Sequence, residues 1–388
     1  KGTEDNRVRK LDYSIQLSKL FYERFINNED ITLFSPHEVP ELYEAWGTEA
    51  FDELYEKAER KTSVSKSKVN SQTLFFDMLK ERAETGRIYI MNIDHCNTHS
   101  SFKDRVTMSN LCQEITLPTD PIQHIDGAGE IALCILSAIN VGKINNVEEL
   151  EPLCELAVRS LDEIIDHQLY PVKAAEISTK ARRSLGIGYI GLAHYIAKNK
   201  VKYSDKQSWK LVDELTEAFQ FYLLKHSNVL ATEKGKNEFF DRTKYSDGIL
   251  PIDTYKPEVD ELVKRKLTYD WEWLRTQIKK NGLRHSTLSA QMPSESSSVV
   301  SNATNGIEPP RDYLSIKKSK KGTLKQIVPQ YATLKNNYTL LWDMADNEGY
   351  INIVAVMQKY FDQAISGNWS YNPENYEDNQ VPVSVMAQ

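Results

Sequence analysis

The sequence IALCILSAINV, residues 131–141, is a nearly continuous apolar run. A run of this length and character predicts a β-strand that is buried on both faces. A second strand is predicted at residues 87–94, where RIYIMNID has the short apolar period of a strand. Because patterns typical of helices lie before and after these two strands, the sequence predicts a protein of the α/β class.

Three- and four-residue apolar spacings and helix stop signals predict the helices. The predicted helices cover residues 11–27, 51–60, 70–85, 146–167, 181–199, 205–233, 258–266, 271–281, 331–343 and 350–365. A strand at 283–292 and a hairpin over 315–325 complete the pattern. The sequence shows no repeat and no long low-complexity linker, which favours one compact unit.

The composition excludes several classes of protein. The 388 residues include 48 Lys and Arg against 55 Asp and Glu, and the net charge of −7 argues against a global nucleic-acid-binding surface. No apolar run approaches about 18 residues, so we expect no membrane-spanning helix. Residues 1–10 hold one apolar side chain and show no secretory signal. Four cysteines are too few for a disulfide-stapled secreted scaffold, which favours a reducing, cytoplasmic setting.

The segment from Gly186 to Gly191, GIGYIG, satisfies the G-x-G-x-x-G pattern of dinucleotide-binding turns. The residues before it are polar and helical rather than a buried strand, and no acidic residue follows a second strand about 20 residues later. We therefore interpret the glycines as small residues that allow close helix packing. A dinucleotide-dependent oxidoreductase is the alternative that this motif would require.

Three weaker signals have simple explanations. Residues 95–99, HCNTH, lack a second ligand pair at zinc-site spacing, so we predict a polar loop and no metal site. The basic run KKSKK at residues 317–321 is interpreted as the solvated tip of a hairpin rather than a phosphate site. Cys154 lies among leucines on a predicted amphipathic helix, which indicates a buried structural thiol.

The residues Asn110-Leu-Cys112-Gln-Glu114 alternate strictly. In an extended backbone Asn110, Cys112 and Glu114 project from one face, so an amide, a thiol and a carboxylate point to one place. The alternative is a half-exposed strand that carries these three residue types by chance. A nearby carboxylate raises the pKa of a thiol and disfavours the thiolate. Hydrogen-atom chemistry therefore suits this cysteine better than nucleophilic attack, with Glu114 as a separate base.

Residues 292–301, MPSESSSVVS, follow a predicted strand and place Pro293 at the first position of a predicted helix. Free N–H groups, hydroxyls and the positive end of the helix dipole make such a start a phosphate site. The alternative is an ordinary capping segment with Ser294 as the N-cap. The following residues, 302–311 (NATNGIEPPR), are dense in turn formers, and long loops of this kind often lie at functional sites.

Three segments carry a resemblance to a known family: 110–119 (NLCQEITLPT), 129–134 (GEIALC) and 293–311 (PSESSSVVSNATNGIEPPR). They resemble the large catalytic subunit of class I ribonucleotide reductase, and the likeness covers essentially the whole chain. Further segments with the same likeness are 87–99, 248–255 and 288–290. The chain resembles the C-terminal portion of that subunit.

The resemblance implies a ten-stranded α/β barrel with a finger loop inside it and flanking helices, of which this chain would supply only part. Residues 1–85 would form a mainly helical N-terminal segment. Residues 86–367 would form the catalytic barrel portion, with the finger loop near Cys112 and the phosphate-binding helix start near Ser294. Residues 368–388 would form a polar C-terminal segment.

The resemblance also implies the activity, which is the conversion of ribonucleoside diphosphates to 2′-deoxyribonucleoside diphosphates for DNA precursor synthesis. Cys112 would become a transient thiyl radical and take the 3′ hydrogen atom of the ribose. Glu114 would remove the proton of the 3′-hydroxyl group, and Asn110 would hydrogen-bond the ribose. A noncatalytic nucleotide-binding or assembly module is the alternative, but a decayed site would have no need to keep these residue types.

Further site residues follow from the same resemblance. Cys134 matches one member of the redox-active thiol pair that closes to a disulfide as the sugar is reduced. Ser294, Glu295, Ser296 and Ser297 match the residues that bind the diphosphate. Ser296 stands where a threonine is common, which keeps the hydroxyl group.

The implied partners lie outside the chain. We expect no cofactor or metal bound by the chain itself, a radical supplied by a metal-containing small subunit, and thioredoxin or glutaredoxin as the external thiol reductant. ATP and dNTP effectors would bind a companion N-terminal part, and the holoenzyme would be a homo-oligomer. We expect no nucleic acid or membrane partner.

The chain departs from the family at both ends. Nothing in it matches the nucleotide-binding activity domain, the specificity loops or the second active-site thiol, since Cys96 and Cys154 lie in other motifs. The paired tyrosines and the two-cysteine tail of the family are not seen either. We therefore expect a fragment or one half of a split subunit, inactive alone, and the start at Lys1 rather than Met fits this expectation.

Overall fold

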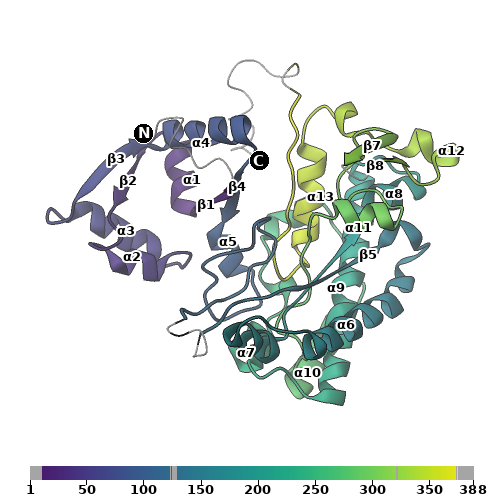
Figure 1. Cartoon of the computed structure of the whole chain (residues 1–388), viewed down its shortest axis with the longest axis horizontal. Helices are drawn as coiled ribbons and strands as arrows, with labels where there is room; N and C mark the ends of the chain where they lie inside the picture. Colours follow the sequence, from purple (N-terminus) through teal and green to yellow (C-terminus); the bar gives the residue numbers. More distant parts are fainter. Residues whose placement is uncertain (1–10, 123, 125–128, 320–321, 373, 375–388) are drawn as a thin grey trace.

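The computed structural model describes residues 11–122, 124, 129–319, 322–372 and 374. These residues form a smaller and a larger lobe that lie side by side (Figure 1). The smaller lobe holds β1 (Tyr13–Leu17), α1 (Lys19–Ile26), β2 (Asp30–Phe34), α2 (Pro40–Ala45), α3 (Phe51–Arg60), β3 (Lys66–Asn70), α4 (Ser71–Thr85) and β4 (Ile88–Asn92). The short helix α5 (Ile93–Thr98) then leads into the larger lobe.

The predicted helix over 11–27 is wrong in its first half. Residues Tyr13–Leu17 form β1 and pair in parallel with β4, while β2 and β3 form a separate antiparallel pair. Ser18 then begins α1, and its hydroxyl accepts a hydrogen bond from Phe21 N at 3.4 Å. Local periodicity does not show β1, because its partner strand lies far away in the sequence.

The larger lobe surrounds a pair of parallel strands with helices. Its elements are β5 (Ile135–Asn140), α6 (Leu150–His167), α7 (Lys173–Arg182), β6 (Leu185–Ile190), α8 (Leu192–Lys198), α9 (Lys206–Lys234), α10 (Trp271–Asn281), α11 (Glu295–Val300), β7 (Leu314–Ser319), β8 (Gly322–Ile327), α12 (Tyr331–Leu334) and α13 (Glu348–Gln358). The long helix α9 lies at the centre, and α6, α10 and α13 pack against it (Figure 1). Apolar residues of β6, α9 and α13 share the main core, in which the Tyr189 and Phe219 rings meet edge to face at 5.3 Å.

The helix predicted over 181–199 is wrong, because a strand interrupts it. All six residues of β6 are buried, and β6 pairs with β5 on one side. On its other side Ile187 N donates to Leu288 O at 2.8 Å. The GIGYIG motif therefore lies on a buried strand and not at a helix packing contact. A dinucleotide-binding motif would place all three glycines in a turn between a strand and a helix. Only Gly191, which has a φ of +80° and precedes α8, lies in such a turn, so the structure does not support this alternative.

The strand predicted over 131–141 is shorter than expected and is not buried on both faces. It is β5, which pairs only with β6 among the described residues, and Leu136 is 46% exposed. The predicted strand over 283–292 forms isolated bridges, Ile187 with Ser289 and Gln291 with Ile365, instead of a regular strand. Backbone pairing of this kind depends on distant segments, which explains both differences.

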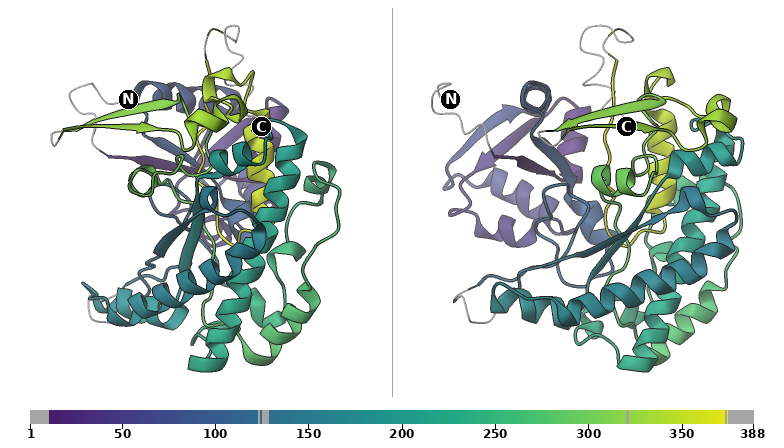
Figure 2. Two further views of the ribbon diagram at one scale, coloured as in Figure 1. Left: turned by 90° about the vertical axis from the view of Figure 1, so that its right-hand side faces the viewer. Right: turned by 45° about the vertical axis from the view of Figure 1, so that its right-hand side comes forward.

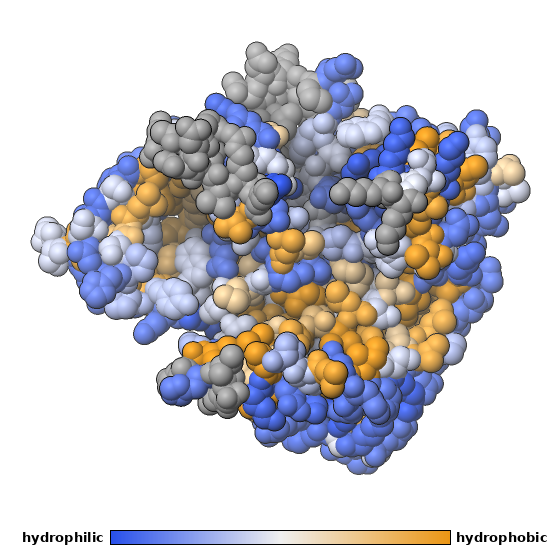
Figure 3. All heavy atoms as spheres, viewed as in Figure 1, coloured by the Kyte–Doolittle hydropathy of each residue, from blue (hydrophilic) through white to orange (hydrophobic). Residues whose placement is uncertain are grey.

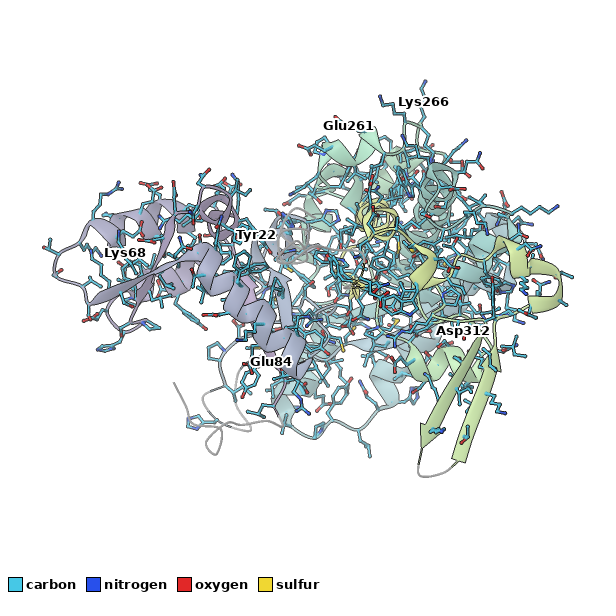
Figure 4. All side chains as sticks on the ribbon, turned by 90° about the horizontal axis from the view of Figure 1, so that it is seen from above. Tyr22, Lys68, Glu84, Glu261, Lys266 and Asp312 are labelled. Carbon is cyan, nitrogen blue, oxygen red and sulfur yellow. The ribbon has the colours of Figure 1, made fainter. Side chains whose placement is uncertain are left out.

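Most of the other predicted elements are confirmed. They are the helices predicted at 51–60, 70–85, 146–167, 205–233 and 271–281 and the hairpin predicted at 315–325. The helix predicted at 350–365 is confirmed only as far as Gln358, where α13 ends. The hairpin, β7 and β8, projects from the body of the larger lobe just after Asp312 (Figures 2 and 4). The helices predicted at 258–266 and 331–343 are wrong over most of their length, because the structure has short 3₁₀ turns there and only the four-residue α12.

The structure confirms a mixed α/β protein. Its eight strands form four two-stranded sheets among the described residues, which do not close into a ten-stranded barrel. No helix in the described part of the chain is long and apolar enough to span a membrane. Of the predicted polar segment 368–388, residues 373 and 375–388 lie outside the described residues.

Candidate active site

The tip of the predicted finger loop is a tight turn over residues 111–113. Gln113 N donates to Asn110 O at 3.2 Å, and Gln113 has a φ of +70°. The prediction of an extended backbone here is therefore wrong, because the turn breaks the period of two. The turn still keeps Cys112 near Glu114, since the charge of this carboxylate acts on the thiol.

The side chain of Asn110 holds this turn together. Its Oδ1 accepts a hydrogen bond from Ile115 N at 3.1 Å, and the neighbouring Ser109 Oγ donates to Ile115 O at 2.8 Å. Asparagine side chains commonly close turns in this way. The Asn110 side chain therefore closes the turn that precedes Glu114, and the backbone between the two residues is not extended as the sequence predicts.

Glu114 is a buried carboxylate, and one of its oxygens accepts no hydrogen bond from the described residues. Its exposed fraction is 3%, and its Oε2 has no hydrogen-bond partner among the described residues. Burial raises the pKa of Glu114, and the hydrogen bond from Asn110 opposes this rise. A carboxylate of raised pKa with an unpartnered oxygen is suited to take a proton from a hydroxyl group brought to it.

Cys112 is half-buried and lies beside Tyr89 of β4. Burial raises the pKa of the Cys112 thiol, the negative charges of Glu114 and Asp12 raise it further, and a hydrogen bond from the Tyr89 hydroxyl opposes the rise. The protonated thiol is therefore favoured. This state suits the transfer of a hydrogen atom and disfavours attack as a thiolate.

Cys134 lies just before β5, against the finger loop. A Cβ atom added to Gly186 would lie 2.5 Å from Cys134 Sγ and 3.2 Å from Ile115 Cδ1, so the thiol and the finger loop border one space. Burial raises the pKa of Cys134, and the charges of Glu114 and Asp362 add to the rise. The carboxylate of Glu114 thus acts on both thiols of the site.

Two backbone hydrogen bonds connect the finger loop to the chain that leads into the serine segment. Ala364 N donates to Glu114 O at 3.1 Å, and Gln291 N donates to Ala364 O at 3.2 Å. The chain then runs from Gln291 to Ser294 in three residues. The backbone around Ala364 therefore links the finger loop to the serine segment.

The four predicted phosphate-binding residues lie at the start of α11. Ser294 is buried at the N-cap position, but its Oγ donates to the backbone carbonyl two residues before it, at 3.1 Å, and does not cap the helix. Glu295, Ser296 and Ser297 are exposed. Pro293 precedes the cap, so the prediction that it is the first helical residue is wrong.

The weaker motifs are structural. Residues 95–98 lie on α5 and not in the predicted loop, and His99 is the C-cap. The His99 ring bonds Gln358 O at 2.7 Å and Thr254 Oγ1 at 2.9 Å. No group of three His, Cys, Asp or Glu side chains in the described ranges could hold a metal ion. The predicted burial of Cys154 is confirmed by its exposed fraction of 0%.

The basic run lies on the exposed hairpin, as predicted for its first two lysines. Lys317 and Lys318 are on β7, and Lys317 Nζ donates to Glu295 O at 2.8 Å. Lys320 and Lys321 lie outside the described residues. The middle of β7 is therefore tied to the start of α11.

Two residues near the site have no clear signal in the sequence. Tyr89 is one residue among several in an apolar strand, and only the fold brings its hydroxyl to Cys112. Asp362 is buried and accepts hydrogen bonds from Ser289 N at 2.8 Å and from Tyr245 OH at 2.6 Å, which fixes the segment beside β6. Its role depends on donors that are distant in the sequence.

Comparison with known proteins agrees with this site. The sequence model of the family described as "Ribonucleotide reductase, barrel domain" matches residues 1–386. The chain belongs to this family. Among its relatives, the "Ribonucleoside-diphosphate reductase subunit alpha" of Haemophilus influenzae is 56% identical over 392 residues, covering all of this chain and 52% of the relative. The "Ribonucleoside-diphosphate reductase 1 subunit alpha" of Escherichia coli is 53% identical and the bacteriophage T4 protein 42% identical, each with the same coverage.

The chain spans about half the length of these ribonucleotide reductase relatives. Family membership confirms the resemblance seen in the sequence. The roles of the individual residues are not tested by the similarity and remain proposals.

Proposed function

We propose that the chain is the catalytic part of a ribonucleoside-diphosphate reductase, which converts ribonucleoside diphosphates to 2′-deoxyribonucleoside diphosphates. One observation carries this proposal: in a chain of this family, the buried Glu114 follows Cys112 by two residues, and its neighbour Ile115 borders the same space as Cys134 Sγ. A base and two thiols at one place are the groups that reduction of a sugar by thiols requires. The side-chain amide of Asn110, which closes the turn before Glu114, would orient the sugar.

The proposed reaction uses these groups in sequence. The Cys112 thiyl radical takes the hydrogen atom from C3′, and Glu114 takes the proton of the 3′-hydroxyl group. The 2′-hydroxyl group then leaves as water. Cys134 and a second thiol supply two electrons and two protons as they close to a disulfide, and Cys112 returns its hydrogen atom to C3′. The net reaction consumes one diphosphate and two thiols and yields a deoxyribonucleotide, a disulfide and water.

The diphosphate group is assigned to the start of α11. Ser294, Glu295, Ser296 and Ser297 would bind it through hydroxyl groups and backbone N–H groups. Two features support this assignment: Ser296 and Ser297 are exposed, and the backbone of this segment is linked to Glu114 through Ala364. A local site of this kind would explain how a chain of net charge −7 holds an anion.

Further parts of the proposal concern what lies outside the chain. We assign residues 86–367 to part of a ten-stranded barrel that a companion N-terminal part completes, carrying the second thiol and the effector sites. A metal-containing small subunit would supply the radical, and thioredoxin or glutaredoxin would reduce the disulfide in a homo-oligomeric holoenzyme. All four cysteines are free in the structure, which favours the reducing cytoplasm as the location.

Reconstitution tests this proposal. The protein is combined with the companion N-terminal part, a radical-generating small subunit and a thiol reductant, and formation of deoxyribonucleotides is measured. We expect turnover that Cys112→Ser abolishes and that Cys154→Ala, which removes a buried thiol elsewhere, retains. Turnover by the Cys112→Ser variant would refute the thiyl role. Diphosphate binding without turnover in any combination would favour a noncatalytic binding module instead.

A further inference from the structure

Gly186 stands on β6 where the backbone does not require glycine. Nine glycines of the described residues have a positive φ, and Gly186 is not one of them. Glycine in the middle of a strand is unfavourable, because it adds chain entropy and has no side chain to pack. A local reason must therefore explain a glycine at this position, and close approach by another group is the usual one.

The space beside Gly186 is filled by the candidate redox thiol. A Cβ atom there would lie 2.5 Å from Cys134 Sγ, 2.7 Å from Leu136 Cδ2 and 3.2 Å from Ile115 Cδ1. Contacts under 3.0 Å are essentially never seen for real Cβ atoms. The start of β5, the finger loop and β6 therefore meet at this one glycine.

The three neighbours differ in how easily they can move. Leu136 is 46% exposed, so its side chain can turn toward solvent. Ile115 is buried in the cluster that holds Met91 and Phe102, and the Cys134 side chain packs against the same cluster. A methyl group on Gly186 must therefore displace the sulfur of Cys134 or disturb the finger loop itself.

We propose that Gly186 is a positioning residue for Cys134: its missing side chain leaves the space in which Cys134 Sγ lies against Ile115, the neighbour of Glu114. The proposal rests on the proposed function in one respect, the redox role of Cys134. It gives the first half of the GIGYIG motif a purpose other than dinucleotide binding. The motif brings the backbone of β6 close to a reacting sulfur.

Gly188 offers a matched control on the same face of the same strand. It too lacks a positive φ. A Cβ atom on Gly188 would lie 2.6 Å from Ala290 O, 3.1 Å from Gln291 Oε1 and 3.1 Å from Met292 Cε, with Cys134 not among its near contacts. Gly188→Ala therefore disturbs β6 without acting on the thiol.

The first experiment measures how fast iodoacetamide alkylates Cys134 in the purified, folded protein, with mass spectrometry as the detection method. Cys154, which is buried elsewhere, provides the reference rate. We expect Gly186→Ala to push the sulfur out of its enclosed space and to raise the rate ratio of Cys134 to Cys154 roughly tenfold, the effect of a pKa lower by about one unit. Gly188→Ala should leave the ratio unchanged. An unchanged ratio in folded Gly186→Ala would overturn the proposal.

The second experiment separates a specific clash from general damage to β6. Overpacking of this size lowers the unfolding midpoint by about 2–6 °C, and we expect Gly186→Ala to do so. In a Cys134→Ala protein the sulfur that the new methyl group would meet is absent. Gly186→Ala should therefore lower the unfolding midpoint of that protein by less than half as much as it does in the parent protein. Equal losses on both backgrounds would overturn the proposal. If Gly186→Ala does not fold, Gly186→Ala/Cys134→Ala must fold, and failure of both would likewise contradict it.

Turnover links this inference to the proposed function. In the reconstituted enzyme, Gly186→Ala should raise the fraction of turnovers that release free nucleobase in place of deoxyribonucleotide, since a displaced Cys134 reduces the intermediate poorly. The alkylation and unfolding measurements do not depend on turnover. If they agree with expectation while the reconstituted protein shows no reductase activity, the proposed function fails and the positioning role of Gly186 stands.

Discussion

At the scale of the residue, one buried carboxylate couples the two thiols of the site. The charge of Glu114 raises the pKa of Cys112 and of Cys134, and burial raises the pKa of Glu114 itself. The two thiols and the carboxyl group lie in one poorly solvated place, where ionisation of one group makes ionisation of the others less favourable. The site therefore favours neutral thiols, and neutral thiols exchange hydrogen atoms rather than act as nucleophiles.

The first prediction concerns Glu114 as the base. Glu114→Gln keeps the shape of the side chain but cannot take a proton, so we expect turnover at saturating substrate to fall by about 10²- to 10⁴-fold. The measurement is the kcat and KM of the reconstituted enzyme. Glu56→Gln, a change at a side chain that is 52% exposed in the smaller lobe, is the control and should retain turnover. A loss well below about 10²-fold would count against Glu114 as the base.

The second prediction concerns Cys134. Cys134→Ser removes a reducing thiol but leaves Cys112 and Glu114 in place, so abstraction of the 3′ hydrogen atom should continue while reduction of the sugar stops. We expect release of free nucleobase from the broken-down intermediate and little deoxyribonucleotide, both measured by chromatography. Normal deoxyribonucleotide formation by this variant would show that Cys134 is not a member of the redox pair.

At the scale of the element, one buried acid joins α6 to the segment between α7 and β6 and to the end of α9. Asp162 is 0% exposed, and Arg183 Nε donates to it at 2.7 Å, Arg284 Nε at 3.0 Å and Lys234 Nζ at 3.2 Å. The buried His285 ring lies 3.2 Å from the same carboxylate. Burial opposes the charged form of Asp162, but His285 and the two arginines outweigh it and hold its pKa far below the usual range.

The third prediction follows from His285, whose pKa burial lowers to about 4 although Asp162 opposes the shift. The unfolded chain protonates His285 below about pH 6.5, whereas the folded protein does so only near pH 4. The contribution of His285 to the free energy of unfolding is therefore fully present above about pH 6.5 and is lost as the pH drops toward 4. At pH 5 the loss from this residue is about 2 kcal/mol. Urea unfolding at pH 7 and pH 5 measures it, and His285→Asn, which cannot titrate, should reduce the difference by that amount. An equal pH dependence in both proteins would exclude His285 as its source.

The fourth prediction tests the buried acid itself. Asp162→Ala leaves Arg183 and Arg284 without their buried partner, so we expect the free energy of unfolding to fall by about 3–5 kcal/mol. Asp166→Ala is the matched control, because its side chain is 40% exposed although it also pairs with Arg183, at 2.8 Å. We expect a loss of about 1 kcal/mol or less from the control. Similar losses in the two variants would show that burial does not set the strength of these pairs.

The elements also show which features a sequence can predict. Helix α4 was predictable because its signals are local: an apolar stripe and Gly86, which ends the helix with a φ of +67°. Strands β1 and β6 were not, because their hydrogen-bond partners lie far along the chain and β6, buried throughout, has no alternation to reveal it. The residue types of the site were predictable from Asn110 to Glu114, but the turn that positions them depends on the left-handed Gln113.

At the scale of the whole molecule, the smaller lobe supports the segment that carries the finger loop. Gln16 Nε2 of β1 donates to Thr107 O at 2.8 Å. Arg105 Nη1 donates to Tyr43 O at 2.7 Å, at α2. The lobe seen beside the main body in Figures 1 and 2 thus contacts the segment that leads into the finger loop.

The larger lobe presents an open apolar face beside this loop. Figure 3 shows apolar residues gathered on the middle of the face turned to the viewer. Leu111 at the finger turn is 53% exposed, and Leu136 on β5 is 46% exposed. Exposed apolar side chains gathered next to the turn at Cys112 are typical of a surface that another part of the protein covers. It fits the proposal that a companion part completes the site.

The last prediction tests whether the smaller lobe holds the finger loop in place. Arg105 lies five residues before Asn110 and reaches α2 through Tyr43 O and, at 3.2 Å, Trp46 O. Arg105→Ala removes both hydrogen bonds, of which the partly buried one to Trp46 O contributes about 1 kcal/mol, so the segment should detach from the lobe more often. We expect faster amide hydrogen exchange at residues 105–115, with unchanged exchange in α9, and a lower turnover in the reconstituted enzyme. Arg60→Ala, at a side chain that is 72% exposed, is the control. The rate of amide exchange depends on the contacts that must break for the segment to open. Unchanged exchange at residues 105–115 would therefore show that contacts to the smaller lobe do not hold the finger loop in place.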